Sequence, residues 1–313
     1  MIRIALVGAG AIAEQHVNAL KRIQDVEVAC IVSASLAEAR NFAQAHSVDT
    51  FDDRLDDVLA RSDIDAVILA SPTQLHAQQA VACLRHEKHV LIEIPAADGK
   101  ADFEAVLSAS RCSDRVCMVA HTSRFYPSHR YMNSLIERGE FALQHLNIQT
   151  LFFRRTNTNM KGEPRCWTDH LLWHHAAHSV DLFRWQCGKI TDVQAMQGPL
   201  HPEVGIAMDM AINLRSESGA ICTLSLSFNN DGPLGSTIRY IGDSGTYVAR
   251  RLSLQDGHGR DVPSPPGGWD ADGVEQQDRE FVSAILENRT PATSIEEVAD
   301  CYRTLALLED CLR

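Results

Sequence analysis

The stretch Ile4-Ala5-Leu6-Val7-Gly8-Ala9-Gly10-Ala11-Ile12-Ala13 runs from an apolar strand through a glycine turn into a helix. Gly8 permits the tight turn, and Gly10 lets the backbone approach a pyrophosphate because it has no Cβ in the way. Ala13 is small, so helix and strand can pack closely. The first N–H groups of the helix can donate to the phosphates; they belong to Ala11 and Ile12. Because the motif follows a strand and opens a helix, it predicts a dinucleotide site rather than a structural turn.

Up to about residue 120, short apolar strands alternate with helical segments. The predicted strands are 2–7, 27–32, 66–70, 89–92 and 117–120. The predicted helices are near 11–22, 35–46, 53–61, 74–86 and 101–110. Strands that are apolar throughout and separated by helices are typical of a parallel sheet covered on both faces. We therefore predict an α/β fold that begins with a doubly wound Rossmann domain over residues 1–121.

From about residue 145, polar and apolar residues alternate between short turns. The predicted strands are 146–155, 193–197, 206–215, 220–228, 237–241 and 246–249, with hairpin turns at 217–219 and 242–245. We therefore predict that residues 122–313 form an α+β domain with a mostly antiparallel sheet. Helices near 275–287 and 294–312 close the chain, and the second opens at a capping box that starts at Ser294. These closing helices are candidates to pack back on the Rossmann domain.

The composition indicates a globular protein with a small-molecule partner. The 313 residues are 45% hydrophobic and 22% charged. The net charge of −12, from 29 basic and 41 acidic residues, argues against nucleic acid or an anionic membrane as partner. No apolar run approaches the ~20 residues of a membrane span, and the chain opens on a strand rather than a signal peptide. The nine cysteines form no CxxC pair, so we expect reduced thiols and a cytoplasmic protein.

Ligands of a parallel sheet bind at the carboxyl ends of its strands. The residues expected there are Ser33, Ser35, Ser71, Pro72, Thr73, Glu93, Ile94 and His121. An acidic residue after the second strand would bind the ribose 2′-hydroxyl of NAD, but this chain has Ser33-Ala34-Ser35. No carboxylate stands there to repel a 2′-phosphate, and the hydroxyls could bind one. We therefore expect NADP, with NAD usable.

Several motifs, in order along the whole chain, resemble the glucose–fructose oxidoreductase/inositol dehydrogenase family. They are the glycine turn, Ala70-Ser71-Pro72-Thr73 with His76, Lys88-His89-Val90, Glu93-Ile94-Pro95 and His178-Ser179-Val180-Asp181. The resemblance implies an NAD(P)-dependent oxidoreductase whose C-terminal sheet serves as the oligomer interface, so we expect a homodimer or higher homo-oligomer. It also implies that Glu93 positions the backbone or the nicotinamide. Pro72, Thr73 and His76 would shape the cofactor cleft.

Two positions depart from the pattern of that family. The family has Glu-Lys-Pro, whose lysine helps to deprotonate a sugar hydroxyl, and an Asp four residues before its catalytic histidine. This chain has Ile94 and His174 at those positions. A simple alcohol needs strong help to lose its proton, so Ile94 argues against a sugar or cyclitol dehydrogenase. It favours a more acidic substrate hydroxyl, or a non-catalytic NAD(P)-binding sensor.

Longer motifs resemble one branch of the family, which acts in protocatechuate 4,5-cleavage. They are Tyr126-Pro127 and residues 152–155, 162–165, 167–170, 171–178 and 228–235. They imply oxidation of the cyclic hemiacetal of a dicarboxylic semialdehyde to a pyrone dicarboxylate. A hemiacetal hydroxyl is more acidic than a simple alcohol, so a neutral imidazole could remove its proton without a lysine.

Histidines at four-residue spacing are the candidate bases. On an α-helix, His170, His174 and His178 would share one face, with Asp181 one turn beyond. We expect either His174 or His178 to be the general base and the other to orient it. His175 stays open between substrate contact and a structural role. Such a face could bind zinc, but the resemblance implies no metal and hydride transfer needs none, so we expect none.

A small dicarboxylate substrate needs cationic partners, and a guanidinium binds a carboxylate through two hydrogen bonds. The candidates are Arg124, Arg154 or Arg155, and Arg165. Arg154 and Arg155 are neighbours on a predicted strand, so only one of them can face the pocket. Trp167 is a candidate to cover the planar ring.

Overall fold

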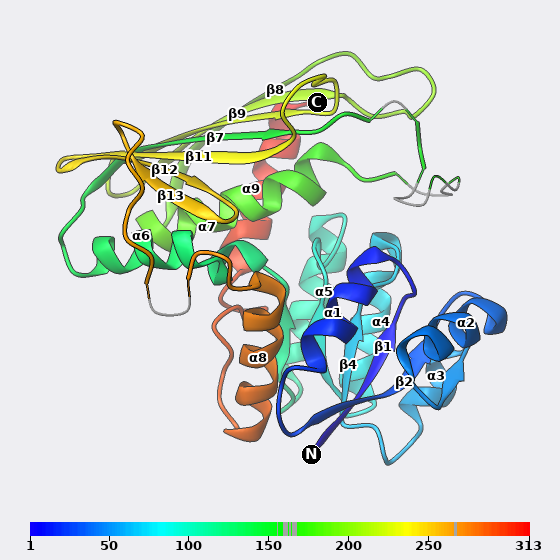
Figure 1. Cartoon of the computed structure of the whole chain (residues 1–313). Helices are drawn as coiled ribbons and strands as arrows, with labels where there is room; N and C mark the ends of the chain where they lie inside the picture. The colour runs from blue at the N-terminus through cyan, green and yellow to red at the C-terminus, as the bar shows by residue number, and fades with distance from the viewer. Residues whose placement is uncertain (155, 159–161, 163, 165–167, 266–267) are drawn as a thin grey trace. The chain divides into compact units, whose positions relative to one another are not determined.

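The structure is a computed structural model that describes residues 1–154, 156–158, 162, 164, 168–265 and 268–313. The chain divides into two compact units (Figure 1). The first contains Met1–His121 and Val274–Ala299, and the second contains Thr122–Gly273 and Asp300–Arg313. The closing helices α8 (Gly273–Leu286) and α9 (Ala299–Cys311) therefore lie mainly in different units. The predicted domain limits, 1–121 and 122–313, stay a prediction.

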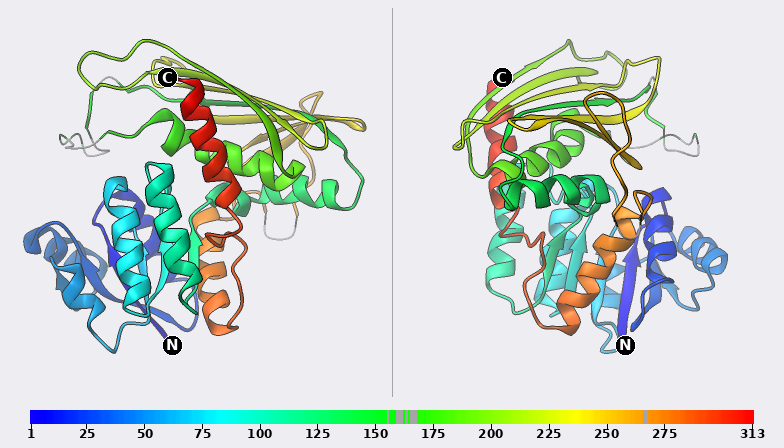
Figure 2. Two further views of the ribbon diagram at one scale, coloured as in Figure 1. Left: turned by 180° about the vertical axis from the view of Figure 1, so that it is seen from behind. Right: turned by 60° about the vertical axis from the view of Figure 1, so that its left-hand side comes forward.

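The first unit holds a six-stranded parallel sheet with the order β3-β2-β1-β4-β5-β6. Its strands are β1 (Ile2–Val7), β2 (Val26–Val32), β3 (Phe51–Asp52), β4 (Ala66–Leu69), β5 (His89–Ile92) and β6 (Cys117–Val119). The helices between them are α1 (Ala11–Leu20), α2 (Leu36–His46), α3 (Leu55–Leu59), α4 (Thr73–Arg85) and α5 (Lys100–Arg111). Helices lie on both faces of the sheet (Figure 2). This covering explains why a strand such as β4 is apolar and buried at every position.

The strand order reverses between β1 and β4, where a parallel sheet opens a crevice for ligands. Gly8 follows β1 with φ +121°, and a Cβ built there would lie 2.3 Å from the carbonyl oxygen of Ala70. The ends of β1 and β4 thus approach so closely that only glycine fits. Gly10 differs, because a Cβ there would have no neighbour within 4 Å. The predicted Rossmann sheet is confirmed.

The second unit holds a seven-stranded sheet with the order β13-β12-β11-β7-β10-β9-β8, antiparallel except between β7 and β10. Its strands are β7 (Leu143–Leu151), β8 (Ile190–Gln197), β9 (Asp209–Ser216), β10 (Ile221–Ser227), β11 (Gly235–Gly242), β12 (Gly245–Arg250) and β13 (Ser253–Asp256). Both predicted hairpin turns join antiparallel neighbours. In β9, buried and exposed residues alternate strictly, because one face of the sheet is covered by helices. The helices of this unit include α6 (Pro127–Glu137) and α7 (Ala177–Cys187).

Some predicted bounds were wrong. The last helix begins at Ala299 rather than at residue 294. Ser294 does cap locally, since its hydroxyl accepts from the Glu297 N–H at 3.1 Å, but the cap serves a turn before the helix. The sequence analysis did not predict α6, β3 or β13, of which the two strands are short and lie at sheet edges. Over the described residues, no helix has both the length and the apolarity to cross a bilayer.

Gly8→Ala should lower the free energy of unfolding of the cofactor-free protein by about 3 kcal/mol or more, because the new methyl meets backbone and the φ is strained. Urea unfolding followed by circular dichroism measures the change. Gly10→Ala is the matched control and should stay within about 1 kcal/mol of the parent, although its methyl should weaken dinucleotide binding. Equal destabilisation by the two substitutions would contradict the role assigned to the β1–β4 approach.

Candidate functional site

The glycine turn of the first unit is shaped to hold phosphate. Helix α1 starts at Ala11 with Gly10 as its N-cap, and no side chain caps it. The N–H groups of the first turn, including that of Ile12, therefore point toward the turn beside Gly8. A helix start without a side-chain cap, reached through glycines, suits a pyrophosphate. The contacts of this turn with a phosphate stay a prediction.

The end of β2 carries a carboxylate that the sequence analysis overlooked. The Ser33 hydroxyl donates to Glu38 Oε2 at 2.6 Å. Ser35 caps α2 by accepting from the Glu38 N–H at 3.2 Å, which brings the first helical turn back over the strand end. The premise that no carboxylate stands near Ser33 was therefore wrong. The carboxylate belongs to Glu38, five residues after Ser33 in the sequence.

His76 joins the turns that follow β4 and β5. It is buried on α4, with Nδ1 2.8 Å from the carbonyl oxygen of Pro95 and Nε2 2.9 Å from that of Ser71. Burial lowers the pKa of this imidazole. Pro72 and Thr73 form the start of α4 beside it. The predicted shaping of the cleft by His76 would thus act through two backbone carbonyls.

The position of the family lysine is apolar and buried in this chain, since Ile94 is only 4% exposed. The preceding residue, Glu93, lies 2.9 Å from the buried His16, which the sequence analysis did not single out. The available signal was a histidine on the otherwise apolar face of α1, among Ala13, Val17 and Leu20.

The histidine segment of the second unit is not a regular α-helix. Residues Leu171–Ala176 form a π-helical turn, η2, and α7 follows at Ala177. His170 precedes the turn, and its Nδ1 accepts from the Leu172 N–H at 3.2 Å. Burial lowers the pKa of His170. The idea that His170, His174 and His178 share one α-helical face was therefore wrong, because a π-turn is wider than an α-turn.

Four basic side chains nevertheless lie close together in this unit. His175 is packed between the rings of Phe152 and Phe228, at centroid distances of 5.2 and 5.0 Å. Its pKa is held well below 6.5 by burial and by the neighbouring positive charges of His174, His178 and Arg154. We call Arg154, His174, His175 and His178 the basic cluster. Such a group attracts an anion and can move a proton.

Asp169 organises one side of the basic cluster. Arg154 donates through Nη1 to Asp169 Oδ2 at 3.0 Å and through Nη2 to Asn157 Oδ1 at 3.2 Å. The other oxygen of Asp169 lies 3.9 Å from His174 Nδ1. Asp169 lies in the motif 167–170, and its place in the sequence indicates no role by itself. Asp169 thus holds Arg154 by a hydrogen bond and places a carboxylate oxygen beside His174.

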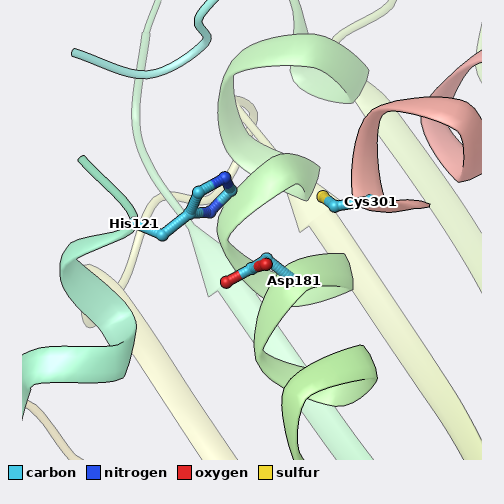
Figure 3. Close-up of side chains that lie close together, drawn as sticks. All are labelled: His121, Asp181 and Cys301. Atoms are coloured by element: carbon cyan, nitrogen blue, oxygen red, sulfur yellow. The ribbon is translucent and has the colours of Figure 1, made fainter. Parts of the chain in front are cut away.

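Arg124 is held by an internal partner. It lies in the short helix η1 (Thr122–Phe125), and its Nε and Nη2 donate to the two oxygens of Asp181 at 2.7 and 2.6 Å. The side chains of Arg124 and Asp181 are 4% and 0% exposed. Figure 3 shows Asp181 on α7, near Cys301 of α9; the Cys301 thiol lies 3.5 Å from the Ala177 carbonyl oxygen. This geometry favours a structural ion pair over the predicted substrate contact of Arg124.

Arg155, Arg165 and Trp167 lie outside the described residues. Among the residues that are described, the three spaced histidines do not bring three ligand atoms within reach of one metal ion. The expectation that the protein needs no metal stays a prediction.

Comparison with known proteins identifies the family. Residues 2–121 match the sequence model of the Gfo/Idh/MocA oxidoreductase family with its NAD-binding Rossmann fold, and residues 127–264 match that of bacterial oxidoreductases, C-terminal. The chain is 54% identical over 308 residues to 4-carboxy-2-hydroxymuconate-6-semialdehyde dehydrogenase of Sphingobium sp. (strain NBRC 103272 / SYK-6), covering 98% of each chain. The chain belongs to the Gfo/Idh/MocA family. The resemblance drawn from the motifs is thereby confirmed.

More distant relatives include sugar and cyclitol dehydrogenases. This chain is 31% identical over 138 residues to scyllo-inositol 2-dehydrogenase (NADP(+)) IolU of Bacillus subtilis (strain 168). The match covers 44% of this chain and 42% of the relative. Levoglucosan dehydrogenase, solved with NADH and levoglucosan, has the same fold, with a TM-score of 0.87 and 21% identity. The match covers 99% of this chain and 95% of that structure. The chain is thus an oxidoreductase with a nicotinamide-dinucleotide-binding Rossmann fold.

Arg124→Ala should lower the free energy of unfolding by about 3–5 kcal/mol, because Asp181 would be left as an unpaired buried charge. Urea unfolding measures the loss. The double variant Arg124→Met/Asp181→Leu should regain most of it, since neither charge then remains. A raised KM for a dicarboxylate substrate, with stability unchanged in Arg124→Ala, would instead support the original assignment of Arg124 to substrate binding.

Proposed function

We propose that this protein oxidises the cyclic hemiacetal of 4-carboxy-2-hydroxymuconate-6-semialdehyde to 2-pyrone-4,6-dicarboxylate in the 4,5-cleavage catabolism of protocatechuate. The observation that carries the proposal is the basic cluster, which combines an anion-binding guanidinium with imidazoles that can accept a proton. The 54% identity to the dehydrogenase named above supports the same reaction. Ile94, buried at the position of the family lysine, argues against a sugar or cyclitol substrate.

The residues divide the chemistry between binding and proton transfer. Arg154, held by Asp169, binds a substrate carboxylate, and His174 on the other side of Asp169 helps to orient the substrate. His178, at the position of the family's catalytic histidine, removes the hemiacetal hydroxyl proton. The electron pair left on that oxygen forms the carbonyl of the lactone, and the two electrons of the C–H bond at the same carbon leave with the hydrogen as hydride. A nicotinamide dinucleotide bound with its pyrophosphate at the glycine turn, where Gly10 has open space beside it, would supply the hydride acceptor.

We propose that both NADP and NAD serve as cofactors and that Glu38 sets the preference of the enzyme between them. The absence of an acidic residue at position 33 favoured NADP, with NAD usable. The Ser33–Glu38 hydrogen bond weakens that argument, because a 2′-phosphate beside Ser33 would be repelled by the carboxylate. The hydroxyls of Ser33 and Ser35 still offer donors to a phosphate.

We also propose that the protein is a cytoplasmic homodimer or higher homo-oligomer joined through its seven-stranded sheet. Edge strand β8 carries Met196, which is 76% exposed, and Ile221 of β10 is exposed as well. A partner sheet would cover these apolar side chains and the strand edges. The eight cysteines among the described residues are all reduced thiols, in keeping with a reducing compartment.

The proposed reaction predicts turnover of the freshly prepared semialdehyde with NADP or NAD, with the pyrone dicarboxylate as product. His178→Gln should lower kcat by about a hundredfold or more while cofactor affinity stays unchanged, because only the base is lost. Reduced-nicotinamide absorbance and chromatography of the product measure both quantities.

His145→Gln is the control for that experiment. His145 lies on β7, away from the basic cluster, with Nε2 2.9 Å from the hydroxyl of Thr223 on β10. This variant should keep full turnover. Full turnover in both His178→Gln and His174→Gln would refute the assignment of the base. Cofactor binding without turnover of the semialdehyde would replace the proposal with the sensor alternative.

Glu38→Gln should raise the ratio of kcat/KM with NADP to kcat/KM with NAD by about tenfold, because a negative charge near the 2′-phosphate is removed. Steady-state kinetics with each cofactor measure the ratio. Asp102→Asn removes an exposed charge from α5 of the same unit and should leave the ratio unchanged. An unchanged ratio in Glu38→Gln would show that this carboxylate does not face the 2′ position.

A further inference from the structure

A histidine in the first unit is buried between two carboxylates. His16 lies on α1 and is fully buried, with Nδ1 2.9 and 2.8 Å from the two oxygens of Asp278 on α8. On the opposite side of the ring, Nε2 lies 2.9 Å from Glu93 Oε1, directly after β5. Asp278 is also fully buried, and the Gln277 amide lies 3.5 Å from one of its oxygens. Three elements that are distant in the sequence thus meet at one imidazole.

The arrangement requires a charged ring. An ionised carboxylate can only accept hydrogen bonds, so opposite ionised Asp278 and Glu93 both ring nitrogens of His16 donate. Burial raises the pKa of Asp278, and the positive charge of His16 opposes that rise. Burial alone would lower the pKa of His16, but the carboxylates of Asp278 and Glu93 outweigh this and raise the pKa to about 10. His16 is therefore an imidazolium at neutral pH, stabilised from both sides.

Glu93 connects His16 to the turn that follows β5, at the predicted cofactor cleft. Its Oε1 faces His16, and its Oε2 accepts from the N–H of Ile94 at 3.2 Å. The next residue of the turn, Pro95, is held by its carbonyl oxygen 2.8 Å from His76 Nδ1. The turn Glu93-Ile94-Pro95 is thus anchored at both ends. The same α1 that carries His16 also presents its N-terminus to the pyrophosphate.

We propose that His16 is a positioning residue for the nicotinamide half of the cofactor. As an imidazolium it fixes the Glu93 carboxylate and, through Glu93, the turn that lines the cleft after β5, while Asp278 holds the ring in place. This inference rests on the proposed use of a nicotinamide dinucleotide, but not on the identity of the substrate.

A second ion pair also joins α1 to α8. It allows a test of whether His16 positions Glu93 or only holds these two helices together. Arg22, just after α1, pairs with Glu275 of α8 through Nε at 2.5 Å. The Arg22 side chain is 48% exposed and lies just beyond the end of α1, so Arg22→Ala is a matched control for loosening α1 from α8. If His16 only joined the two helices, both variants would act alike.

The test compares NADH with ADP-ribose, which lacks the nicotinamide, by calorimetric titration. His16→Gln should raise the Kd of NADH by about tenfold, because a charged hydrogen bond that fixes Glu93 is lost. The Kd of ADP-ribose should stay within about twofold, and Arg22→Ala should change neither value. Equal weakening of both ligands, or of neither, by His16→Gln would overturn the proposal. Because no substrate is used, the outcome is independent of the proposed reaction.

If His16→Gln does not fold, Glu93→Gln and the parent protein give the answer. Glu93→Gln removes one carboxylate from His16, and it should weaken NADH but not ADP-ribose. In the ¹⁵N-histidine spectrum of the parent at pH 8, the His16 ring should carry protons on both nitrogens. A neutral His16 ring under those conditions would equally overturn the proposal.

Discussion

The close approach of β1 to β4 at Gly8 is the constraint on which the first unit depends. The backbone after β1 passes so near the Ala70 carbonyl that no side chain fits, and because all strands of this sheet are parallel, their carboxyl ends lie at one edge. The glycine turn, Ser33 after β2 and Glu93 after β5 then lie along that edge. The cofactor cleft that we propose depends on this placement, because residues distant in the sequence must meet at one edge to form it.

Buried ion pairs also fix the positions of elements within each unit. Charges removed from water must be paired, and the pairs fix the geometry of whatever they join. His16 joins α1, α8 and the turn after β5, while Arg124 and Asp181 join η1 to α7. Arg154 differs from Arg124 because its carboxylate partner, Asp169, also faces His174. Arg124 thus joins two elements of the fold, whereas Arg154 and its partner Asp169 lie beside the histidines to which we assign the proposed chemistry.

The proposed chemistry follows from what replaces the family's lysine. A buried isoleucine cannot assist deprotonation of an ordinary alcohol, so the substrate hydroxyl must be acidic enough for an imidazole. A hemiacetal meets that requirement. The carboxylates of the same substrate account for the guanidinium beside the histidines. The residues of the site and the acidity of the substrate hydroxyl therefore favour the same proposed reaction, the oxidation of a hemiacetal.

Local periodicity and contiguous motifs were enough to predict the strand–turn–helix start, the parallel and antiparallel sheets, and the family. The sequence also identified His174, His175, His178 and Arg154 as candidates, since their motifs are contiguous. Only the tertiary structure brought Glu38 to Ser33, Asp181 to Arg124, and the distant residues 93 and 278 to His16. It also decided that residues 171–176 form a π-turn, which four-residue spacing does not reveal. These features depend on how charges are paired once they are buried, and burial is set by the whole fold rather than by neighbours in the chain.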